Sequence, residues 1–420
     1  VGSEMCIRDR GEVPTARGAS RRELGAHYTH EALILRVLQP LCLEGLEASH
    51  ALVSSPEDGQ RLLTRLSQLT FLDPACGAGN FLLTTYVQLR RLEWELWQRF
   101  EKDWTDGPRV RVAQMHGIEL DPVASRLAQT MLGLAEAWCD RAFEERFGQQ
   151  PVEGRRARIT TGNALHLAWE DVLPPGQCAY ILGNPPFVGA KQMTTAQRAD
   201  AAAVFKGIAG AGVLDYVAAW HVKAARYIQA NPQVEVAFVS TSSLAQGEQP
   251  GVLWPWLWQQ GVSLGFAHRP FEWTSAGLGA AAVHCIVLGM GLTDKPIKAL
   301  YAYPGGLRSE PVLQAVGAIS PYLVEGPNVA LPRRSRPLGE APTMMTGNKP
   351  IDGGHYLFTG EEKAAFLGTE PEAAPYFHRW VGSEEFLKGL ERWVLWLGDI
   401  DQAVLDTCLL YTSPSPRDTR

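Results

Sequence analysis

Residues 70–81, TFLDPACGAGNF, determine which fold the rest of the chain can adopt. The stretch begins as an apolar strand, passes through a glycine turn and enters a helical segment that reaches Trp97. Gly77 and Gly79 have no Cβ, so the backbone there can pass close beneath a ligand. The helix N-terminus adds free N–H groups, as in nucleotide-binding turns. Taken alone, such a turn can also be a plain strand–helix connection, and that alternative stays open.

Strands and helices alternate from this turn to about residue 239, which predicts an α/β fold with a doubly wound, mostly parallel sheet. The expected strands after the turn are residues 112–122, 157–165, 178–187 and 234–244. The expected helices are residues 123–138 and 215–228. Residues 261–271 and 280–290 read as two more strands with no helix between them, so we expect an antiparallel hairpin at one edge of the sheet.

The alternating pattern ends near residue 305, where proline- and glycine-rich stretches such as GPNVALPRRSRPLGEAP begin at residue 326. We therefore expect a helical segment at residues 11–60, a catalytic domain at residues 61–305 and the start of a mixed second domain at residues 306–407. The tails are interpreted differently. One DNA sequence encodes residues 408–418, and its complementary strand in another frame encodes residues 1–9. That DNA resembles a transposase mosaic-end sequencing adapter, so residues 1–10 and 408–420 are interpreted as artefacts and the second domain as truncated.

The composition is that of a globular protein, with 45% hydrophobic and 20% charged residues. The net charge of −6 gives no general attraction to nucleic acid, so any DNA contact must come from local basic patches such as residues 332–337. No CxxC spacing joins the cysteines between the tails, which favours a reducing cytoplasm and argues against structural zinc. The longest apolar run, residues 279–292, is too short to span a bilayer.

Several histidines and tryptophans are expected to be core residues rather than ligands. The histidines lie far apart in sequence and mostly in apolar contexts, so no metal site is predicted: His116, His221, His268 and His284. The tryptophans of the second domain are likewise expected in a core rather than stacked on bases: Trp380, Trp393 and Trp396.

Two polar residues follow the second and third expected strands. Glu119 in HGIELDP lies where a carboxylate can accept hydrogen bonds from both hydroxyls of a ribose. Asn163 in TTGNAL ends the third strand and could reach an adenine ring of a cofactor. A turn-forming asparagine explains Asn163 equally well, and the sequence does not decide between the two.

The segment GNPPF, residues 183–187, indicates chemistry on an amine. The Asn184 side chain has a carbonyl acceptor, and Pro185 has no N–H, so its own carbonyl can be held in a fixed direction. Two adjacent acceptors suit an exocyclic amine: accepting both N–H groups draws the nitrogen toward tetrahedral geometry and frees its lone pair. Phe187 adds a flat face for a base taken out of its helix. An isolated NPP is more often a rigid loop, but here it follows a cofactor-type turn and a strand-terminal acid in order.

These motifs resemble those of a known family. LGAHYT at residues 24–29, DPACGAGNF, GIELDP, GNAL and GNPPF, in this order, resemble the amino-group DNA methyltransferases that use S-adenosylmethionine, in their gamma arrangement. Longer stretches resemble the MmeI-like type IIG restriction–modification proteins: GNPPFVGAKQM, LDYVAAWHVKAA, STSSLAQGEQPGVLW, FAHRPFEWTSAGLGAAAVHC, GNKPIDGG and GSEEFLKGLERW. The resemblance spans Arg21 to Ile400. It implies a class I S-adenosylmethionine-dependent methyltransferase fold followed by part of a target-recognition domain.

The resemblance also implies a reaction and a set of site residues. It implies transfer of a methyl group to N6 of an adenine flipped out of double-stranded DNA, without a metal, in a cytoplasmic prokaryotic restriction–modification or related defence system. Cofactor binding would fall to Tyr28, Thr29, Asp73, Ala75, Gly77, Gly79 and Glu119. The target base would be handled by Asn184, Pro185, Pro186 and Phe187. Phe271 or Trp273 would contact the other side of the base, and the sequence does not choose between them.

Three other functions compete with this interpretation. A methyltransferase acting on a protein glutamine or an RNA base would use the same NPPF segment, but it does not explain the large region after residue 305. An NAD-dependent Rossmann enzyme would need GxGxxG, which the glycine turn lacks. A non-catalytic DNA-binding module would not need an intact NPPF, and a test of cofactor binding would identify it.

Overall fold

The computed structural model describes residues 31–100, 104, 107–149, 156–273, 283–334, 339–340 and 353–397. Both tails interpreted as artefacts lie outside these ranges, as do Tyr28 and Thr29. The chain divides into two compact units, residues 1–333 and 334–420. The first unit continues past the expected boundary at residues 305 and 306, because one more strand, Val312–Val316, joins its sheet after that point.

The first unit is built on a nine-stranded sheet with the order β3-β2-β1-β4-β5-β7-β6-β8-β9. The strands are β1 (Phe71–Asp73), β2 (Met115–Glu119), β3 (Arg158–Thr161), β4 (Tyr180–Gly183), β5 (Glu235–Thr241), β6 (Ser263–Trp273), β7 (Val283–Gly291), β8 (Lys298–Ala302) and β9 (Val312–Val316). Strands β1 to β5 pair in parallel, and β7 pairs antiparallel with both β5 and β6. The predicted mostly parallel sheet and its hairpin are confirmed.

The hairpin of β6 and β7 does not form the edge of the sheet, contrary to the expectation. Strand β8 pairs in parallel with β6, and β9 pairs antiparallel with β8. Both strands are only five residues long and sit among turn-forming residues. They follow the point where strands and helices stop alternating, so no strand–turn–helix pattern marks them in the sequence.

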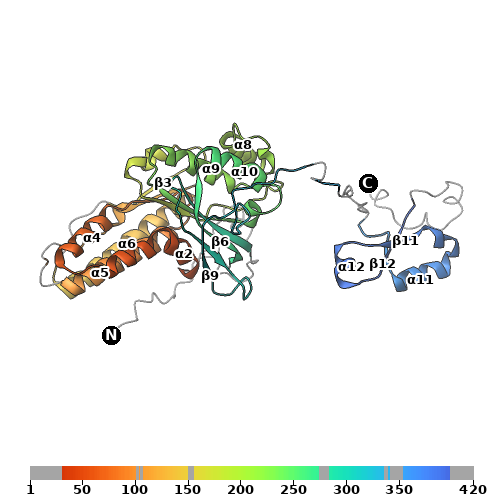
Figure 1. Cartoon of the computed structure of the whole chain (residues 1–420), viewed down its shortest axis with the longest axis horizontal. Helices are drawn as coiled ribbons and strands as arrows, with labels where there is room; N and C mark the ends of the chain where they lie inside the picture. Colours follow the sequence, from red (N-terminus) through yellow and green to blue (C-terminus); the bar gives the residue numbers. More distant parts are fainter. Residues whose placement is uncertain are drawn as a thin grey trace. The chain divides into compact units, whose positions relative to one another are not determined.

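Helices cover both faces of this sheet (Figure 1). One group comprises α2 (Glu31–Leu38), η1 (Gln39–Leu43), α3 (Glu44–Ala51), α4 (Pro56–Gln68), α5 (Asn80–Phe100) and α6 (Pro122–Phe147). The other comprises α7 (Trp169–Val172), α8 (Thr195–Val204), α9 (Ala218–Tyr227) and α10 (Pro250–Gln259). Short 3₁₀ turns join them: η2 (Val112–Gln114), η3 (Pro175–Gln177), η4 (Ala211–Val213), η5 (Ile228–Ala230) and η6 (Ser242–Ala245). Each group encloses its own apolar core against the sheet.

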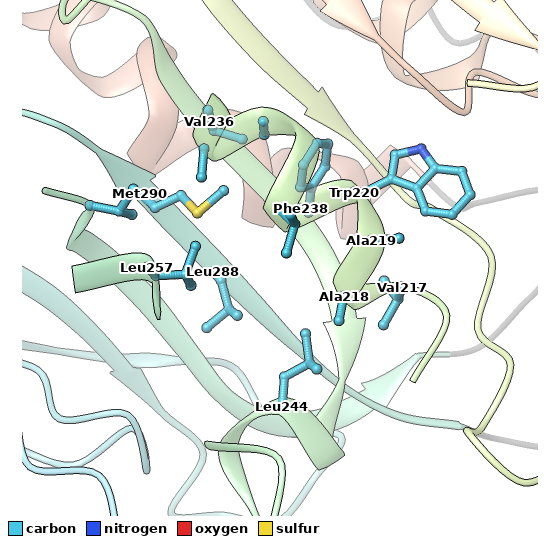
Figure 2. Close-up of a cluster of buried hydrophobic side chains, with 14 of the residues drawn as sticks. Val217, Ala218, Ala219, Trp220, Val236, Phe238, Leu244, Leu257, Leu288 and Met290 are labelled. Atoms are coloured by element: carbon cyan, nitrogen blue, oxygen red, sulfur yellow. The ribbon is translucent and has the colours of Figure 1, made fainter. Parts of the chain in front are cut away.

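Helix α9 is the centre of one of these cores (Figure 2). Eight of its ten residues are buried, and a helix that is apolar on nearly all sides belongs inside a domain. Small residues at Ala218 and Ala219 let it approach the sheet closely. There Phe238 of β5 and Leu288 of β7 are buried beside it. The helix is therefore held firmly, which matters because its N-terminal end lies beside the candidate site.

The second unit has a small mixed fold of its own. It contains β10 (Leu357–Thr359), α11 (Gly360–Thr369), η7 (Pro371–Tyr376), β11 (Phe377–Trp380), α12 (Ser383–Lys388) and β12 (Arg392–Leu395). Its three strands form an antiparallel sheet in the order β10-β12-β11. Trp393 is half-buried and packs on the small core of this unit, as expected, and Trp380 is half-buried. Trp396 is exposed, so its assignment to the core is wrong.

A buried ion cluster joins α5 to α6 in the first unit. Arg90 donates to Asp140 at 2.7 Å and lies 3.4 Å from Glu93, and both Arg90 and Glu93 are almost completely buried. Glu93 also accepts the backbone N–H groups of Arg109 and Val110 at 2.6 and 3.1 Å. These donors compensate for the cost of burying the carboxylates, so the cluster depends on each of its members.

Replacing the cation of this cluster, Arg90→Met, is expected to lower the free energy of unfolding by about 3–5 kcal/mol, because buried carboxylates lose their partner. Chemical denaturation measures the difference. Arg141→Met is the matched control. Arg141 forms an exposed ion pair with Glu145 within α6, so removing this pair should leave the free energy of unfolding unchanged. Equal stability of both variants would contradict the role assigned to the buried cluster.

Candidate active site

The candidate site lies where the strand order of the sheet reverses. Strands β1 and β4 are adjacent and parallel, but the chain continues from β1 toward β2 and from β4 toward β5. Loops leaving the carboxyl ends of such a strand pair diverge and form a crevice, where ligands bind in open α/β sheets. The glycine turn follows β1 here. The segment after β4, residues 184–190, also begins here and is called the NPPF loop below.

The glycine turn is held by hydrogen bonds from its own backbone. Asp73 ends β1 and accepts the N–H of Ala75 at 3.0 Å, and Gly77 donates its N–H to Glu119 at 2.7 Å. Gly77 and Gly79 have φ of +54° and +87°, in the left-handed region that favours glycine. A Cβ on Gly79 would lie 3.0 Å from that of Ala128 on α6, whereas a Cβ on Gly77 would meet nothing within 4 Å. The turn is thus packed on one side and open at Gly77.

Glu119 joins the end of β2 to the glycine turn. One carboxylate oxygen accepts the N–H of Gly77 and the other accepts the N–H of Asp121 at 2.8 Å. Burial raises the pKa of Glu119 above its ordinary value of 4.5, and these two hydrogen bonds oppose the rise. A carboxylate has about four acceptor positions, so Glu119 can accept two further hydrogen bonds.

Asp73 and Gly183 bring the ends of β1 and β4 into direct contact. Asp73 is 1% exposed, and burial raises its pKa to about 8. A Cβ on Gly183 would lie only 2.4 Å from the Asp73 carboxyl oxygen, and the φ of Gly183 is +150°. Both observations require glycine at this position. No role was expected for Gly183 from the sequence, although it directly precedes Asn184 of GNPPF.

The NPPF loop leaves one acceptor without a partner. The side-chain oxygen of Asn184 is buried and has no hydrogen-bond partner among the residues that the structure describes. Pro185 is buried, whereas Pro186 and Phe187 are half-buried. Phe187 packs against both apolar cores. An unpaired buried acceptor costs free energy, so its retention points to a ligand donor that it receives.

Asn163 adopts the turn-forming arrangement. Its carbonyl oxygen accepts the N–H of Leu165 at 2.9 Å, and its amide donates to Asp200 of α8 at the same distance. Asp200 also contacts His166 at 2.7 Å. Both ends of the Asn163 side chain are therefore occupied within the chain. Of the two roles considered for this residue, the observed geometry matches the turn.

The two aromatic candidates near the hairpin have different surroundings. Phe271 is fully buried, stacked 5.2 Å from the ring of Tyr303 and 5.2 Å from the guanidinium of Arg36. It belongs to one of the two apolar cores of the first unit. Trp273 ends β6, and its side chain lies outside the described parts of the structure.

The histidines behave mostly as expected. His221 and His268 are buried and His116 is half-buried, and burial lowers the pKa of His116 and His221 to about 4. His284 is exposed, contrary to its assignment to the core. In the ranges that the structure describes, no group of His, Cys, Asp or Glu side chains could hold a metal ion. No helix in those same ranges is long and apolar enough to cross a membrane.

The side chains of two residues of LDYVAAW contact the loops of the site, and neither contact was recognised from the sequence. Asp215 accepts the N–H of Ala190 in the NPPF loop at 3.0 Å. Trp220 donates its indole N–H to the carbonyl of Pro74 in the glycine turn at 3.0 Å. Asp215 could have been noticed in the sequence as a charged residue within an apolar segment. Nothing in the sequence alone indicated which loops the segment would touch.

The contact between β1 and β4 can be tested with Gly183→Ala. The added methyl must displace the Asp73 carboxyl and strain the backbone, so we expect a loss of about 1–3 kcal/mol in the free energy of unfolding. Gly176→Ala is the control, because a Cβ there meets nothing within 4 Å. Combining Gly183→Ala with Asp73→Ala should recover part of the loss. Wild-type stability of the Gly183→Ala protein would show that the two strand ends are not tightly packed.

Comparison with known proteins identifies both parts of the chain. The family described as "MmeI, DNA-methyltransferase domain" matches residues 50–302, and "MmeI, target recognition domain" matches residues 325–409. DNA methyltransferase A of Bacillus subtilis (strain 168) is 34% identical over 394 residues, which cover 90% of this chain and 44% of that protein.

A solved structure agrees with these matches. The type IIL restriction–modification enzyme MmeI, solved in complex with DNA, is 40% identical and superposes with a TM-score of 0.86. The aligned region covers 93% of this chain and 54% of MmeI, so the chain spans about half the length of the relatives it matches. With more than half of its residues matched by the methyltransferase model, the chain belongs to the MmeI DNA-methyltransferase family.

Proposed function

We propose that this chain transfers a methyl group from S-adenosylmethionine to the N6 amine of an adenine in double-stranded DNA, within a restriction–modification system of prokaryotic cytoplasm. The observation that carries the proposal is the buried side-chain oxygen of Asn184 after β4, which has no hydrogen-bond partner in the described parts of the chain. An acceptor held in this way suits an amine donor. Two findings support DNA as the molecule that bears this amine. The chain belongs to the MmeI family, and the solved structure of MmeI contains DNA.

The residues at the strand ends fit S-adenosylmethionine. Gly77 is open on the side where a Cβ would stand, so a ligand can lie against the backbone of the glycine turn. Glu119 has free acceptor positions for the two ribose hydroxyls. Asn163 is already bonded within the chain, so we propose that it shapes the loop after β3 and does not bind adenine directly. Tyr28 and Thr29, beyond the described residues, are proposed to hold the methionine end.

S-adenosylmethionine supplies, when bound, an electrophilic methyl group on a positively charged sulfur. The chain's own contribution is to orient and activate the acceptor. The side-chain oxygen of Asn184 and the carbonyl of Pro185 would each accept one N–H of the target amine, which frees the nitrogen lone pair for in-line attack. Phe187 would stack on the flipped base. Positioning and preorganised acceptors then provide most of the rate acceleration.

The second face of the base remains to be assigned. Because Phe271 is buried in the core, we propose Trp273 rather than Phe271 for the contact there. The match of residues 325–409 to a target-recognition domain favours DNA over a protein glutamine or RNA base. Sequence-specific binding needs contacts to base edges in addition to phosphate contacts. We propose that the second unit contributes the base-edge contacts.

Glu119→Ala is expected to weaken S-adenosylmethionine binding by about 1–3 kcal/mol, because charge-assisted hydrogen bonds to the ribose are lost. Titration calorimetry measures the affinity. The affinity of the wild-type chain should be complete above the raised pKa of Glu119 and fall as the pH drops through it, starting above the ordinary value of 4.5. Glu119→Gln should remove this pH dependence. Unchanged affinity in Glu119→Ala, or binding of NAD instead, would refute the cofactor assignment.

Asn184→Ala is expected to keep cofactor binding and to lower methyl transfer by about 100-fold or more, the usual effect of losing a preorganised transition-state contact. The measurement uses an excess of the chain, labelled S-adenosylmethionine and DNA of mixed sequence, followed by mapping of N6-methyladenine. Asn231→Ala is the matched control, since Asn231 is bonded to the carbonyl of Pro175, before the start of β4. Wild-type transfer by Asn184→Ala would end the argument from the unpaired oxygen.

A further inference from the structure

We propose that Asp215 is a positioning residue that holds the NPPF loop in the geometry needed to receive the target amine. The inference rests on the proposed function and deepens it, because it explains how the free acceptor of Asn184 is kept in place. Asp215 does not touch the reacting atoms. It acts through the backbone of the loop that carries them.

The carboxylate of Asp215 connects the NPPF loop to the end of β5. One oxygen accepts the backbone N–H of Ala190 at 3.0 Å, and the other accepts the hydroxyl of Thr241, also at 3.0 Å. Thr241 is the last residue of β5, the strand that pairs in parallel with β4. A single side chain therefore ties the far end of the loop to the strand next to the one from which the loop begins.

Asp215 is itself held in place from several directions. It is 6% exposed, and its backbone N–H donates to the side-chain oxygen of Gln249 at 3.0 Å. The next residue, Tyr216, donates its N–H to the carbonyl of Val188 at 2.9 Å. Two hydrogen bonds thus join residues 215–216 to the NPPF loop, and α9 begins three residues after Asp215. Because α9 is almost completely buried, its N-terminal end is a firm anchor.

A buried carboxylate costs free energy unless donors compensate for it. Here the compensating donors are one loop amide and one strand hydroxyl, both bonded to a charged acceptor. Such charge-assisted bonds are about twice as strong as neutral ones. An asparagine could form bonds at the same places, since its oxygen can accept the N–H of Ala190 and its amide can donate to Thr241. An alanine could form neither.

The NPPF loop needs this anchor because the side-chain oxygen of Asn184 does not hold the loop in place. This oxygen has no partner among the described residues, so that end of the Asn184 side chain does not fix the loop. The start of the loop is fixed by Gly183 against Asp73, and its end by Ala190 against Asp215. Catalytic groups must be held within about 0.5 Å of the productive geometry. With the Asp215 side chain removed, the loop would keep its contact at Gly183 and the hydrogen bond from Tyr216 to Val188, but Ala190 would lose its link to the end of β5.

The test compares Asp215→Ala, Asp215→Asn and Thr241→Val with the wild-type chain. Hydrogen exchange of the backbone amides from Phe187 to Ala190 reports on the order of the loop. Calorimetry reports S-adenosylmethionine affinity, and single-turnover transfer of labelled methyl to DNA reports the chemical step. Glu93→Gln is the matched control. Glu93 is also a buried carboxylate that accepts backbone N–H groups, but it lies in the ion cluster between α5 and α6.

Asp215→Ala is expected to speed amide exchange in the loop and to slow methyl transfer by about tenfold to a hundredfold, with cofactor affinity unchanged. Asp215→Asn should restore most of both properties, and Thr241→Val should give a smaller effect in the same direction. Glu93→Gln should lower the melting temperature without changing loop exchange. A merely structural role for Asp215 would make the Asp215 and Glu93 variants behave alike.

Wild-type loop exchange and transfer rate in Asp215→Ala would overturn the proposal. If that variant does not fold, Thr241→Val decides, and wild-type exchange and rate there would overturn it. If instead the proposed function is wrong, the wild-type chain itself would transfer no methyl group to DNA. In that case loop exchange would still show whether Asp215 orders the NPPF loop, so the two failures can be told apart.

Discussion

The close contact between the Asp73 carboxyl and the α-carbon of Gly183 is the constraint on which the site depends. Any side chain at Gly183 would occupy the space of that carboxyl, so the ends of β1 and β4 can meet only with glycine there. These two strands flank the point where the strand order reverses, and each carries one of the two loops of the site. The spacing of the glycine turn and the NPPF loop is thus set by the packing of the Asp73 side chain against the backbone at Gly183.

Most of the fold was predictable because its signals are local. Alternating strands and helices, the glycine turn and the order of the motifs predicted a doubly wound sheet and its hairpin, and the structure confirms them. The strands beyond the hairpin were missed because β8 and β9 follow the end of the alternating pattern, and the pairing of β8 with β6 joins residues more than 30 positions apart. The exposed His284 and Trp396 were misassigned because apolar neighbours in sequence do not show whether a side chain faces the core. His284 lies on the exposed face of β7, and Trp396 follows the last residue of β12.

The strand-end positions of the candidate residues could be predicted from the sequence, but their connections could not. The sequence allowed Asn163 to be a ligand residue or a turn residue, and its hydrogen bonds to Leu165 and Asp200 became visible only in the structure. Phe271 and Trp273 are two apart on one strand, and the burial of Phe271 became visible only once β6 was placed in the sheet. Asp215 is 25 residues from the amide that it accepts. A contact between residues so far apart produces no periodic pattern in a single sequence, so it could not be predicted.

The segment from Asp215 to Trp220 contacts both loops of the site from one short stretch of chain. Asp215 receives the N–H of Ala190 from the NPPF loop, and Trp220 donates to the carbonyl of Pro74 in the glycine turn. Because α9 is packed on nearly all sides, these two contacts cannot shift independently by large amounts. The side-chain oxygen of Asn184 has no partner among the described residues, and it can stay so only if the surrounding backbone does not move onto it. The buried helix α9, the two contacts made by Asp215 and Trp220, and the glycine at the end of β4 all restrict such movement. Packing outside the site in this way offsets part of the free energy cost of this acceptor.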